Sequence, residues 1–175
     1  MPTASVSSNA KTRKSTSKAR AKPATSATRP ADAIKLLRDD HREVKNWFKE
    51  YEKLEDEAER EALARKICAA LTVHARIEEE IFYPALRESI EDQDLLDEAA
   101  VEHASAKQLI AEIESMSPDE ELFDAKVKVL GEYVMHHVQE EEQEMFPEAR
   151  ESDVDLRALG AQLSKRKAEL MKKAS

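Results

Sequence analysis

Residues 74–84 read HARIEEEIFYP, and this stretch decides the fold because the chain contains it a second time, as HVQEEEQEMFP at residues 137–147. Each copy places a Glu four residues after its His. Four residues turn about 400° on an α-helix, so His74 and Glu78 are expected on one face, about 6 Å apart. His137 and Glu141 have the same spacing. Each pair is therefore predicted to supply one side of a metal site.

The repeat extends upstream of both copies. His41 lies 33 residues before His74, and His103 lies 34 residues before His137. Four of the five histidines in the chain thus fall into two units of the same form. A repeat of this length indicates two equivalent halves of one fold.

Composition points to an all-α protein. A chain of 175 residues is long enough for one domain with a sizeable core, and it contains only two Gly and 37% charged residues. Abundant Ala, Glu, Lys, Leu and Arg favour helices over strands. The single Cys68 excludes an internal disulfide and is typical of a reducing compartment. Its neighbours Ile67, Ala69 and Ala70 predict a small buried residue, with a redox role as the alternative.

Charge divides the chain into two parts. The formal net charge is −9, yet residues 1–30 contain seven basic and no acidic residues, which leaves −16 on the remainder. Residues 1–30 also lack aromatic side chains, so we expect a disordered basic tail. The tail is predicted either to contact nucleic acid or another anionic surface, or to act only as a solubilising leader. An organelle transit peptide is a further alternative, although the apolar half of an amphipathic helix is missing.

Hydropathy leads to an expectation about location. The sequence has no run of about 18 apolar residues, so we expect no membrane-spanning helix. The N-terminal region has basic residues but lacks the apolar segment of a secretion signal. The expected location is therefore the cytoplasm.

Apolar residues recur at three- and four-residue steps, which is the period of a helical face. They predict five helices, which cover about residues 31–56, 60–84, 93–116, 118–147 and 153–172. Ser117, Pro118 and Glu120 form the N-cap pattern that starts the fourth helix, and Ser152 is expected to cap the fifth. Pro84 and Pro147 are expected to kink or end the second and fourth helices.

Four of these helices are predicted to form an up-down-up-down four-helix bundle over residues 31–150, and residues 151–175 add a C-terminal helix. Each of the four carries a His inside its apolar stripe, and the second and fourth add a Glu. The candidate metal ligands are His41, His74, Glu78, His103, His137 and Glu141. A buried carboxylate without a partner costs several kcal/mol, so both Glu residues need a cation, a proton or a strong donor. Four core histidines without metal are the alternative, but six polar groups would then have few partners.

The mixture of four imidazoles and two carboxylates is typical of a transition metal of intermediate softness. Ca²⁺ and Mg²⁺ prefer mostly oxygen ligands, and structural zinc sites often use thiolates. We therefore predict two iron ions, with Glu78 and Glu141 bridging them. How the four histidines divide between the two ions is not determined by the sequence.

Several residues beside the motifs need separate interpretation. His136 also precedes a Glu by four residues, but it is turned about 100° from His137, and we place it at the surface. Tyr133 lies about one turn before His137 and is either a donor to the site or a core residue with its hydroxyl at the rim. Glu144 is predicted on the site face as a second candidate proton donor. Gly131 in mid-helix predicts a close approach of two helices.

Two further expectations concern helix faces. Glu79 and Glu80 are turned away from Glu78 by about 100° and 200°, and we expect a solvated face there. The third helix is predicted to direct one apolar stripe inward. That stripe consists of Leu96, Ala100, His103, Ala106, Ile110 and Ile113.

The pattern resembles the hemerythrin-like family of HHE cation-binding domains over about residues 31–150. His41, His74-x-x-x-Glu78, His103 and His137-x-x-x-Glu141 match the ligand positions of that family, and both copies end in the F-x-P or F-P of the family. The resemblance implies a non-haem diiron centre with an oxo or hydroxo bridge. It also implies binding of dioxygen, or a response to oxygen, nitric oxide, peroxide or iron supply.

Two positions differ from the oxygen-carrying hemerythrins. Those proteins have a second His four residues after the third-helix His, where this chain has Lys107. They place the last carboxylate five residues after its His, which would be Glu142, whereas Glu141 fits the internal repeat. The four-histidine pattern is more similar to bacterial HHE proteins and to the iron-sensing domain of a eukaryotic F-box protein. Ferritin-like diiron proteins use Glu-x-x-His, which none of the five histidines provides.

These residues predict a cytoplasmic diiron protein that binds dioxygen or a related small oxidant, in oxygen, iron or redox sensing or in stress protection. One alternative is an enzyme that acts on peroxide or nitric oxide with the same centre. Another is a regulatory module whose basic tail, residues 1–30, binds nucleic acid.

Overall fold

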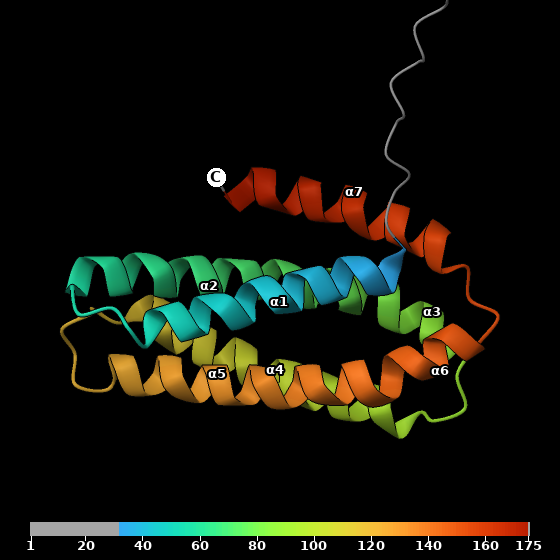
Figure 1. The fold of residues 1–175 in the computed structure, drawn as a ribbon, viewed down its shortest axis with the longest axis horizontal. Helices are drawn as coiled ribbons and strands as arrows, with labels where there is room; N and C mark the ends of the chain where they lie inside the picture. Colours follow the sequence, from blue (N-terminus) through green and yellow to red (C-terminus); the bar gives the residue numbers. More distant parts are fainter. Residues whose placement is uncertain (1–31, 175) are drawn as a thin grey trace, which may run out of the picture.

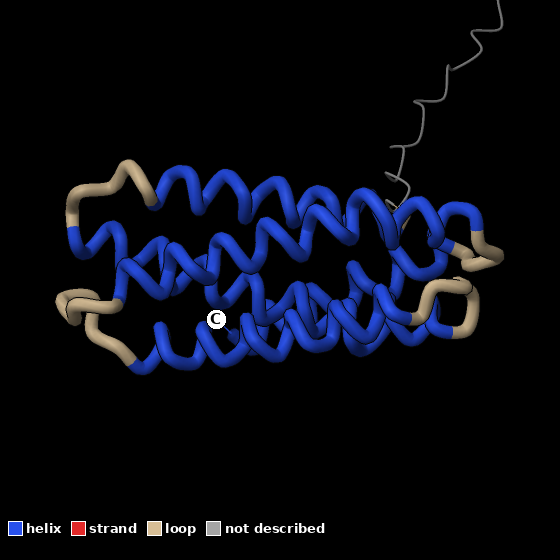
Figure 2. The backbone as a smooth tube through the Cα atoms, turned by 90° about the horizontal axis from the view of Figure 1, so that it is seen from below, coloured by secondary structure: helices blue, strands red, loops and turns tan. Residues whose placement is uncertain are grey.

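The computed structural model describes residues 32–174, which form helices and no strands (Figure 1). The bundle consists of the long helices α1 (Ala33–Tyr51), α2 (Glu57–Ile77), α4 (Asp94–Ser115) and α5 (Phe123–Glu140). Successive long helices run in opposite directions, and their connections lie at the two ends of the bundle (Figure 2). The predicted all-α bundle is therefore confirmed. The predicted tail, residues 1–30, lies outside the described residues.

The C-terminal helix α7 (Leu156–Ala174) lies along the outer side of α1 and α2 (Figure 1). Its side chains Leu159, Leu163 and Leu170 are buried in one apolar cluster with Leu37 of α1. The helix is where the sequence places it, but its cap differs. Asp155, and not Ser152, accepts from the backbone amides of Arg157 and Ala158.

Side-chain caps explain the first two helix starts. Asp32 accepts from the amide of Lys35 at 2.8 Å, and Asp56 accepts from the amide of Glu59 at 2.9 Å. Both caps satisfy amides that have no partner inside the helix. The expectation that the first helix extends to Asp56 is wrong, because α1 ends at Tyr51 and Asp56 already caps α2.

The predicted start of the fourth helix at Ser117 is also wrong, because α5 begins at Phe123. Half of the expected capping box is present, since the carboxylate of Glu120 accepts from the amide of Ser117 at 2.7 Å. The amide of Phe123 then bonds the carbonyl of Glu120, so two successive turns replace the expected first helical turns. These turns bring the side chain of Phe123 into the core.

Both copies of the repeated stretch contain a π-helical turn, η1 (Glu78–Phe82) and η2 (Glu141–Met145). The amide of Tyr83 bonds the carbonyl of Glu78, and the amide of Phe146 bonds the carbonyl of Glu141, each five residues back. Proline follows at once in both copies, and its ring cannot fit the regular α-helical pattern at that point. The prolines therefore do not end the helical path, which continues into α3 (Tyr83–Arg87) and α6 (Phe146–Glu151).

The wide turns change which residues are buried. One extra residue per turn rotates the chain, so that Phe82 and Tyr83 are buried while Ile81, three residues after Glu78, is only half-buried. Turns of this kind occur often at functional sites. On α4 the expected inward residue Ala100 is exposed, and Ala99 is buried in its place.

The buried apolar residues form two clusters separated along the bundle. One contains Leu37, Phe82 and Phe146, and the other contains Ile67 and Leu130. On α1, α2 and α4 the histidine of the repeat lies between residues of the first cluster and residues of the second, and His137 on α5 lies between Val134 of the second cluster and Met145 of the first, in η2. The fold therefore places a polar layer across the middle of an otherwise apolar core.

Two smaller expectations agree with the structure. A Cβ atom on Gly131 would lie 3.0 Å from Cδ1 of Phe48, so the glycine does permit close approach of α5 and α1. Cys68 is buried, and burial raises the pKa of its thiol to about 12. No helix within residues 32–174 has the length and apolar character needed to cross a membrane.

Candidate metal centre

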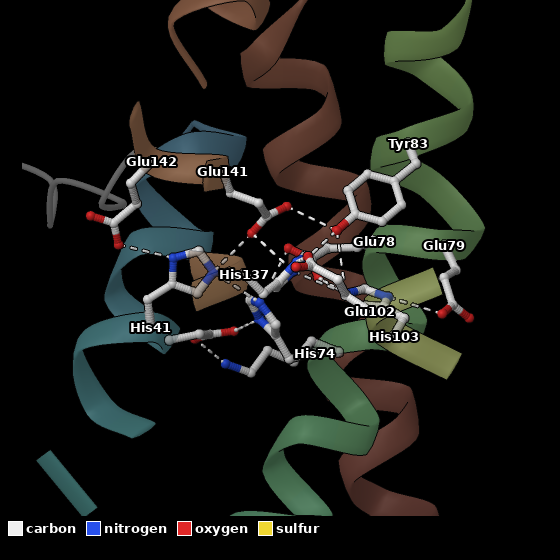
Figure 3. A network of polar contacts seen from close by, with 12 residues as sticks. His41, His74, Glu78, Glu79, Tyr83, Glu102, His103, His137, Glu141 and Glu142 are labelled. Atoms are coloured by element: carbon white, nitrogen blue, oxygen red, sulfur yellow. Dashed lines mark hydrogen bonds and ion pairs between the residues drawn. The ribbon is translucent and has the colours of Figure 1, made fainter. Parts of the chain in front are cut away.

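The six residues that the sequence predicts as ligands converge in the polar layer (Figure 3). The four imidazoles come from α1, α2, α4 and α5, and the two carboxylates come from the first residues of η1 and η2. All six side chains are buried, and Glu78 is fully enclosed. The six residues are His41, His74, Glu78, His103, His137 and Glu141.

The histidines form two pairs. Nε2 of His41 lies 3.0 Å from Nε2 of His74, and Nε2 of His103 lies 3.1 Å from Nε2 of His137. Each pair thus joins two neighbouring helices of one repeat unit. The structure thus brings His41 next to His74, and His103 next to His137.

Each carboxylate spans both histidine pairs. The oxygens of Glu78 lie 3.1 Å from Nε2 of His74 and 3.5 Å from Nε2 of His103. One oxygen of Glu141 lies 3.2 Å from Nε2 of His41 and 3.6 Å from Nε2 of His137. Two overlapping groups of ligand atoms result. They are His41, His74, Glu78 and Glu141, and Glu78, His103 and His137.

The other ring nitrogen of each histidine faces a carboxylate. Nδ1 of His103 lies 2.9 Å from Glu79, and Nδ1 of His137 lies 2.8 Å from Glu102. Nδ1 of His41 lies 3.0 Å from Glu142, and Nδ1 of His74 lies 3.4 Å from Asp40. A carboxylate only accepts hydrogen bonds, so Nδ1–H is the donor and the lone pair of Nε2 points inward. All four rings are thereby held in the tautomer that binds a metal.

Protonation equilibria differ among the site histidines, because burial lowers the pKa of His103 whereas nearby carboxylates raise the pKa of His74 and His137. Burial alone would lower the pKa of His74, but the negative charge of Glu78 outweighs it and raises that pKa to about 10. Burial likewise opposes the charge on His137, and Glu141 raises its pKa to about 9. Burial would raise the pKa of Glu141, yet the facing imidazoles hold it below its ordinary value.

The unpaired oxygen atoms fit a bound cation. Both oxygens of Glu78 and one oxygen of Glu141 are buried without a hydrogen-bond donor among the described residues. The two inward nitrogens of each histidine pair lie about 3 Å apart, so their lone pairs repel one another unless a proton or a metal cation lies between them. The donor set of imidazole nitrogens and carboxylate oxygens suits a transition metal ion.

A buried phenol, Tyr83, completes the layer, and the sequence interpretation missed it. Its hydroxyl donates to Glu141 at 2.9 Å and lies 3.3 Å from Nε2 of His103 and 3.5 Å from Nε2 of His137 (Figure 3). Burial and the nearby carboxylates hold its pKa well above the usual range. The equivalent residue in the second copy is Phe146, which stacks on His41. A signal existed, since Tyr and Phe occupy matching places in the repeat, but assigning Tyr83 to the site required the π-helical turn.

A small cavity borders the layer, and Glu78 and Glu141 are not among its lining residues. Its volume is about 40 Å³, and all four site histidines line it together with Asp40, Glu102, Lys107, Tyr133 and apolar residues. The apolar lining includes Val44, Leu71, Ala106, Ile110 and Val134. A cavity holds one water when the volume open to a water-sized probe is roughly 10–15 Å³, so this space suits only a molecule of a few atoms.

Four neighbouring residues lie away from the ligand atoms or have other roles. Tyr133 is 50% exposed and lines the cavity described above, so its role as a donor stays a prediction. Glu144 is exposed, so its predicted place on the site face is wrong. The side chain of His136 is 66% exposed and pairs with Glu140, as expected for a surface residue. Glu142 binds the outer nitrogen of His41, which leaves Glu141 as the inward carboxylate.

Glu79 is only partly the solvated residue that was expected. Its carboxylate holds Nδ1 of His103 and contacts Lys107, the residue at the position where oxygen carriers have a further histidine. Glu80 does lie at the surface, where it pairs with Arg76 and Arg166.

A helical bundle with imidazoles and carboxylates enclosed at its centre defines a metal-cation-binding protein. The sequence profile of the hemerythrin HHE cation-binding domain matches residues 32–149. The chain belongs to this family, and metal-cation binding follows from that membership.

Two known proteins show the extent of the likeness. A DNA nickase of Nostoc sp. is 32% identical over 115 residues, which are 66% of this chain and 32% of that protein. The matched region is therefore about a third of the length of that relative. A crystal structure of a hemerythrin HHE cation-binding domain-containing protein from Mycobacterium kansasii superposes with a TM-score of 0.70 at 24% identity, covering 82% of this chain and 90% of the other. This second likeness supports the fold.

Proposed function

We propose that the six converging residues bind two iron ions and that the centre takes up dioxygen or a related small oxidant. His41 and His74 would hold one ion, and His103 and His137 the other. Glu78 and Glu141, whose oxygens face both pairs, would bridge them. The unpaired oxygens of these carboxylates support the proposal, because bound cations would supply the partners that the protein does not.

Iron fits the chemistry of this donor set and the family. Mixed imidazole and carboxylate ligands favour metals of intermediate softness over calcium or magnesium. When bound, a pair of irons supplies redox chemistry and open coordination positions for a small ligand. The surrounding protein would hold the imidazoles in the binding tautomer through their outer carboxylates and would keep bulk water out.

The observation that carries the choice of ligand is the cavity of about 40 Å³ against the four histidines. Its volume accepts a diatomic molecule or peroxide and excludes organic substrates of ordinary size. Its apolar walls favour an uncharged ligand over an ion. We therefore assign it to dioxygen, nitric oxide or peroxide, in sensing of oxygen, iron or redox state or in stress protection.

Tyr83 would make the two iron positions unequal. The ligand group of His103 and His137 has one member fewer than the other group, and the hydroxyl of Tyr83 lies beside both of its imidazoles. The phenol donates its proton to Glu141 at 2.9 Å, and Tyr83 is not among the residues that line the cavity. The chain thus keeps one buried phenol beside the candidate ligands, while Tyr133 lines the cavity from a half-exposed position.

The test of small-ligand binding is Ala106→Leu, which places three further carbon atoms in the cavity. Ala106 lines the cavity and is not among the ligand atoms. We expect this variant to keep the iron content of the wild-type protein and to lose most of its nitric oxide binding, measured by optical titration without oxygen. Unchanged nitric oxide binding with full iron content would contradict the assignment of the cavity.

A second candidate is an enzyme that turns over peroxide or nitric oxide, and the buried phenol of Tyr83 favours it. Proton delivery from a side chain contributes typically 10²–10⁴-fold to a rate. Steady peroxide consumption by the iron-loaded protein that falls by about that factor in Tyr83→Phe would support an enzyme. A protein that binds peroxide once without turnover would favour a carrier or sensor.

Nucleic-acid contact through residues 1–30 stays a prediction. Its supports are the seven basic residues of that segment and the name of the Nostoc relative, of which the matched region is only a third. Equal affinity for DNA with and without residues 1–30, measured at low salt, would remove this candidate.

A further inference from the structure

Every histidine of the site is followed outward by a carboxylate and then by a second positively charged or protonatable group. The same order, imidazole, carboxylate and outer base, occurs four times. The four chains are His41–Glu142–Lys45, His74–Asp40–Lys167, His103–Glu79–Lys107 and His137–Glu102–His136.

One of these outer groups comes from outside the bundle. Lys45, Lys107 and His136 belong to α1, α4 and α5, whereas Lys167 belongs to α7. Its ammonium group lies 2.5 Å from Oδ1 of Asp40, and Oδ2 of Asp40 faces Nδ1 of His74 at 3.4 Å. Asp40 therefore divides its two oxygens between α7 and a candidate metal ligand. The Asp40 side chain is only 12% exposed, so solvent screens this pair weakly.

The neighbouring residue of α7 contacts the same half of the site. Arg166 binds both oxygens of Glu80, with the shorter contact at 2.6 Å. Glu80 lies in η1, the turn that begins with Glu78. Two successive basic residues of α7 thus contact the carboxylate behind His74 and the turn that carries Glu78.

The space beneath α7 leads to the same histidine. A groove of about 260 Å³ lies between α1, α2 and α7, and its lining includes Asp40, Trp47, His74 and Lys167. If α7 left the bundle, water would reach Asp40 and the outer side of His74. Docking of α7 therefore controls both the partner and the hydration of this ligand.

We propose that α7 contributes to metal binding, because Lys167 positions His74 through Asp40. Cation binding and docking of α7 then strengthen one another. The inference rests on the proposed ligand role of His74. A cation on Nε2 polarises the ring, which strengthens the bond from Nδ1–H to Asp40 and fixes that carboxylate for Lys167. Because coupling between two binding equilibria is reciprocal, loss of the Lys167 contact weakens cation binding.

The test uses the full chain, stripped of metal and titrated with cobalt(II) in competition with a chelator. Lys167→Met removes the charge and keeps the hydrocarbon stem, and we expect its cobalt dissociation constant to rise about tenfold, the lower end of the effect of outer partners on metal affinity. Lys167→Arg should recover most of the lost affinity. Lys165→Met alters an exposed lysine of the same helix and should leave the constant unchanged.

The reciprocal measurement is hydrogen exchange of the α7 amides with and without cobalt. Cobalt should slow exchange of α7 in the wild-type chain and slow it less in Lys167→Met. Equal cobalt affinity in Lys167→Met and the wild type, with α7 exchange independent of cobalt, would overturn the inference and leave the proposed ligands intact. A wild-type chain that binds no cobalt or iron would overturn both.

Discussion

Glu78→Met is expected to stabilise the metal-free protein and to weaken the metal-loaded one. Both carboxylate oxygens of Glu78 are buried without a hydrogen-bond donor among the described residues. Each such atom costs about 1–3 kcal/mol, and methionine fills a similar volume without polar atoms. Without Glu78 burial lowers the pKa of His74, 3.1 Å away, so the ring becomes neutral and leaves no unpaired charge. The lost attraction between the two side chains cancels part of the gain. We expect a net stabilisation of about 2 kcal/mol, which raises the melting temperature by about 4–8 °C in a chain of this size.

Iron should reverse this order. A ligand at 100 times its dissociation constant stabilises the protein that binds it by about 2.7 kcal/mol, and only the wild type retains the carboxylate that we propose as a bridge. Thermal unfolding followed by circular dichroism, once with chelator and once with excess iron(II) under anaerobic conditions, compares the two states. Glu144→Met, at an exposed position of η2, serves as the control and should shift stability by no more than about 0.5 kcal/mol. A Glu78→Met protein that melts below the wild type in chelator would refute the reasoning.

Three further predictions follow from individual contacts. Gly131→Ala should destabilise the fold by about 1 kcal/mol in urea unfolding, because the close contact of the new Cβ with Phe48 costs more than the helix propensity gained. Higher stability of the variant would show that the Phe48 ring moves aside at little cost. His137→Ala should lower iron content, as metal analysis would show, whereas His136→Ala should leave it unchanged. Equal losses in the two variants would contradict the choice of His137 over His136 as the metal ligand. Tyr83→Phe should weaken the second of two iron-binding steps about tenfold in a titration, and two unchanged steps would exclude its role in the weaker group.

Much of the fold follows from periodicity alone. The stripes on the four long helices place their histidines between two apolar clusters, and a step of four residues brings His74 and Glu78 together on any α-helix. The repeat also distinguishes His137 from His136, because only one of them stands at the matching distance from the closing proline.

The remaining features depend on departures from regular geometry. A uniform helical period cannot show that the turn after Glu78 widens, and this widening directs Tyr83 toward Glu141. The pairing of the histidines and the outer carboxylates depends on how whole helices sit against each other. Asp40 contacts Lys167 only because α7 folds back along the bundle. Contacts of this kind join residues far apart in the sequence and leave no local pattern.

The most direct test of the two-ion centre is the number of iron ions per chain, measured by native mass spectrometry after anaerobic reconstitution with iron(II). The proposed centre predicts two ions in the wild type and reduced occupancy in His74→Ala, since that substitution removes one imidazole from the first group of candidate ligands. A wild-type chain that retains no iron, or a His74→Ala chain that retains the same amount as the wild type, would contradict the account.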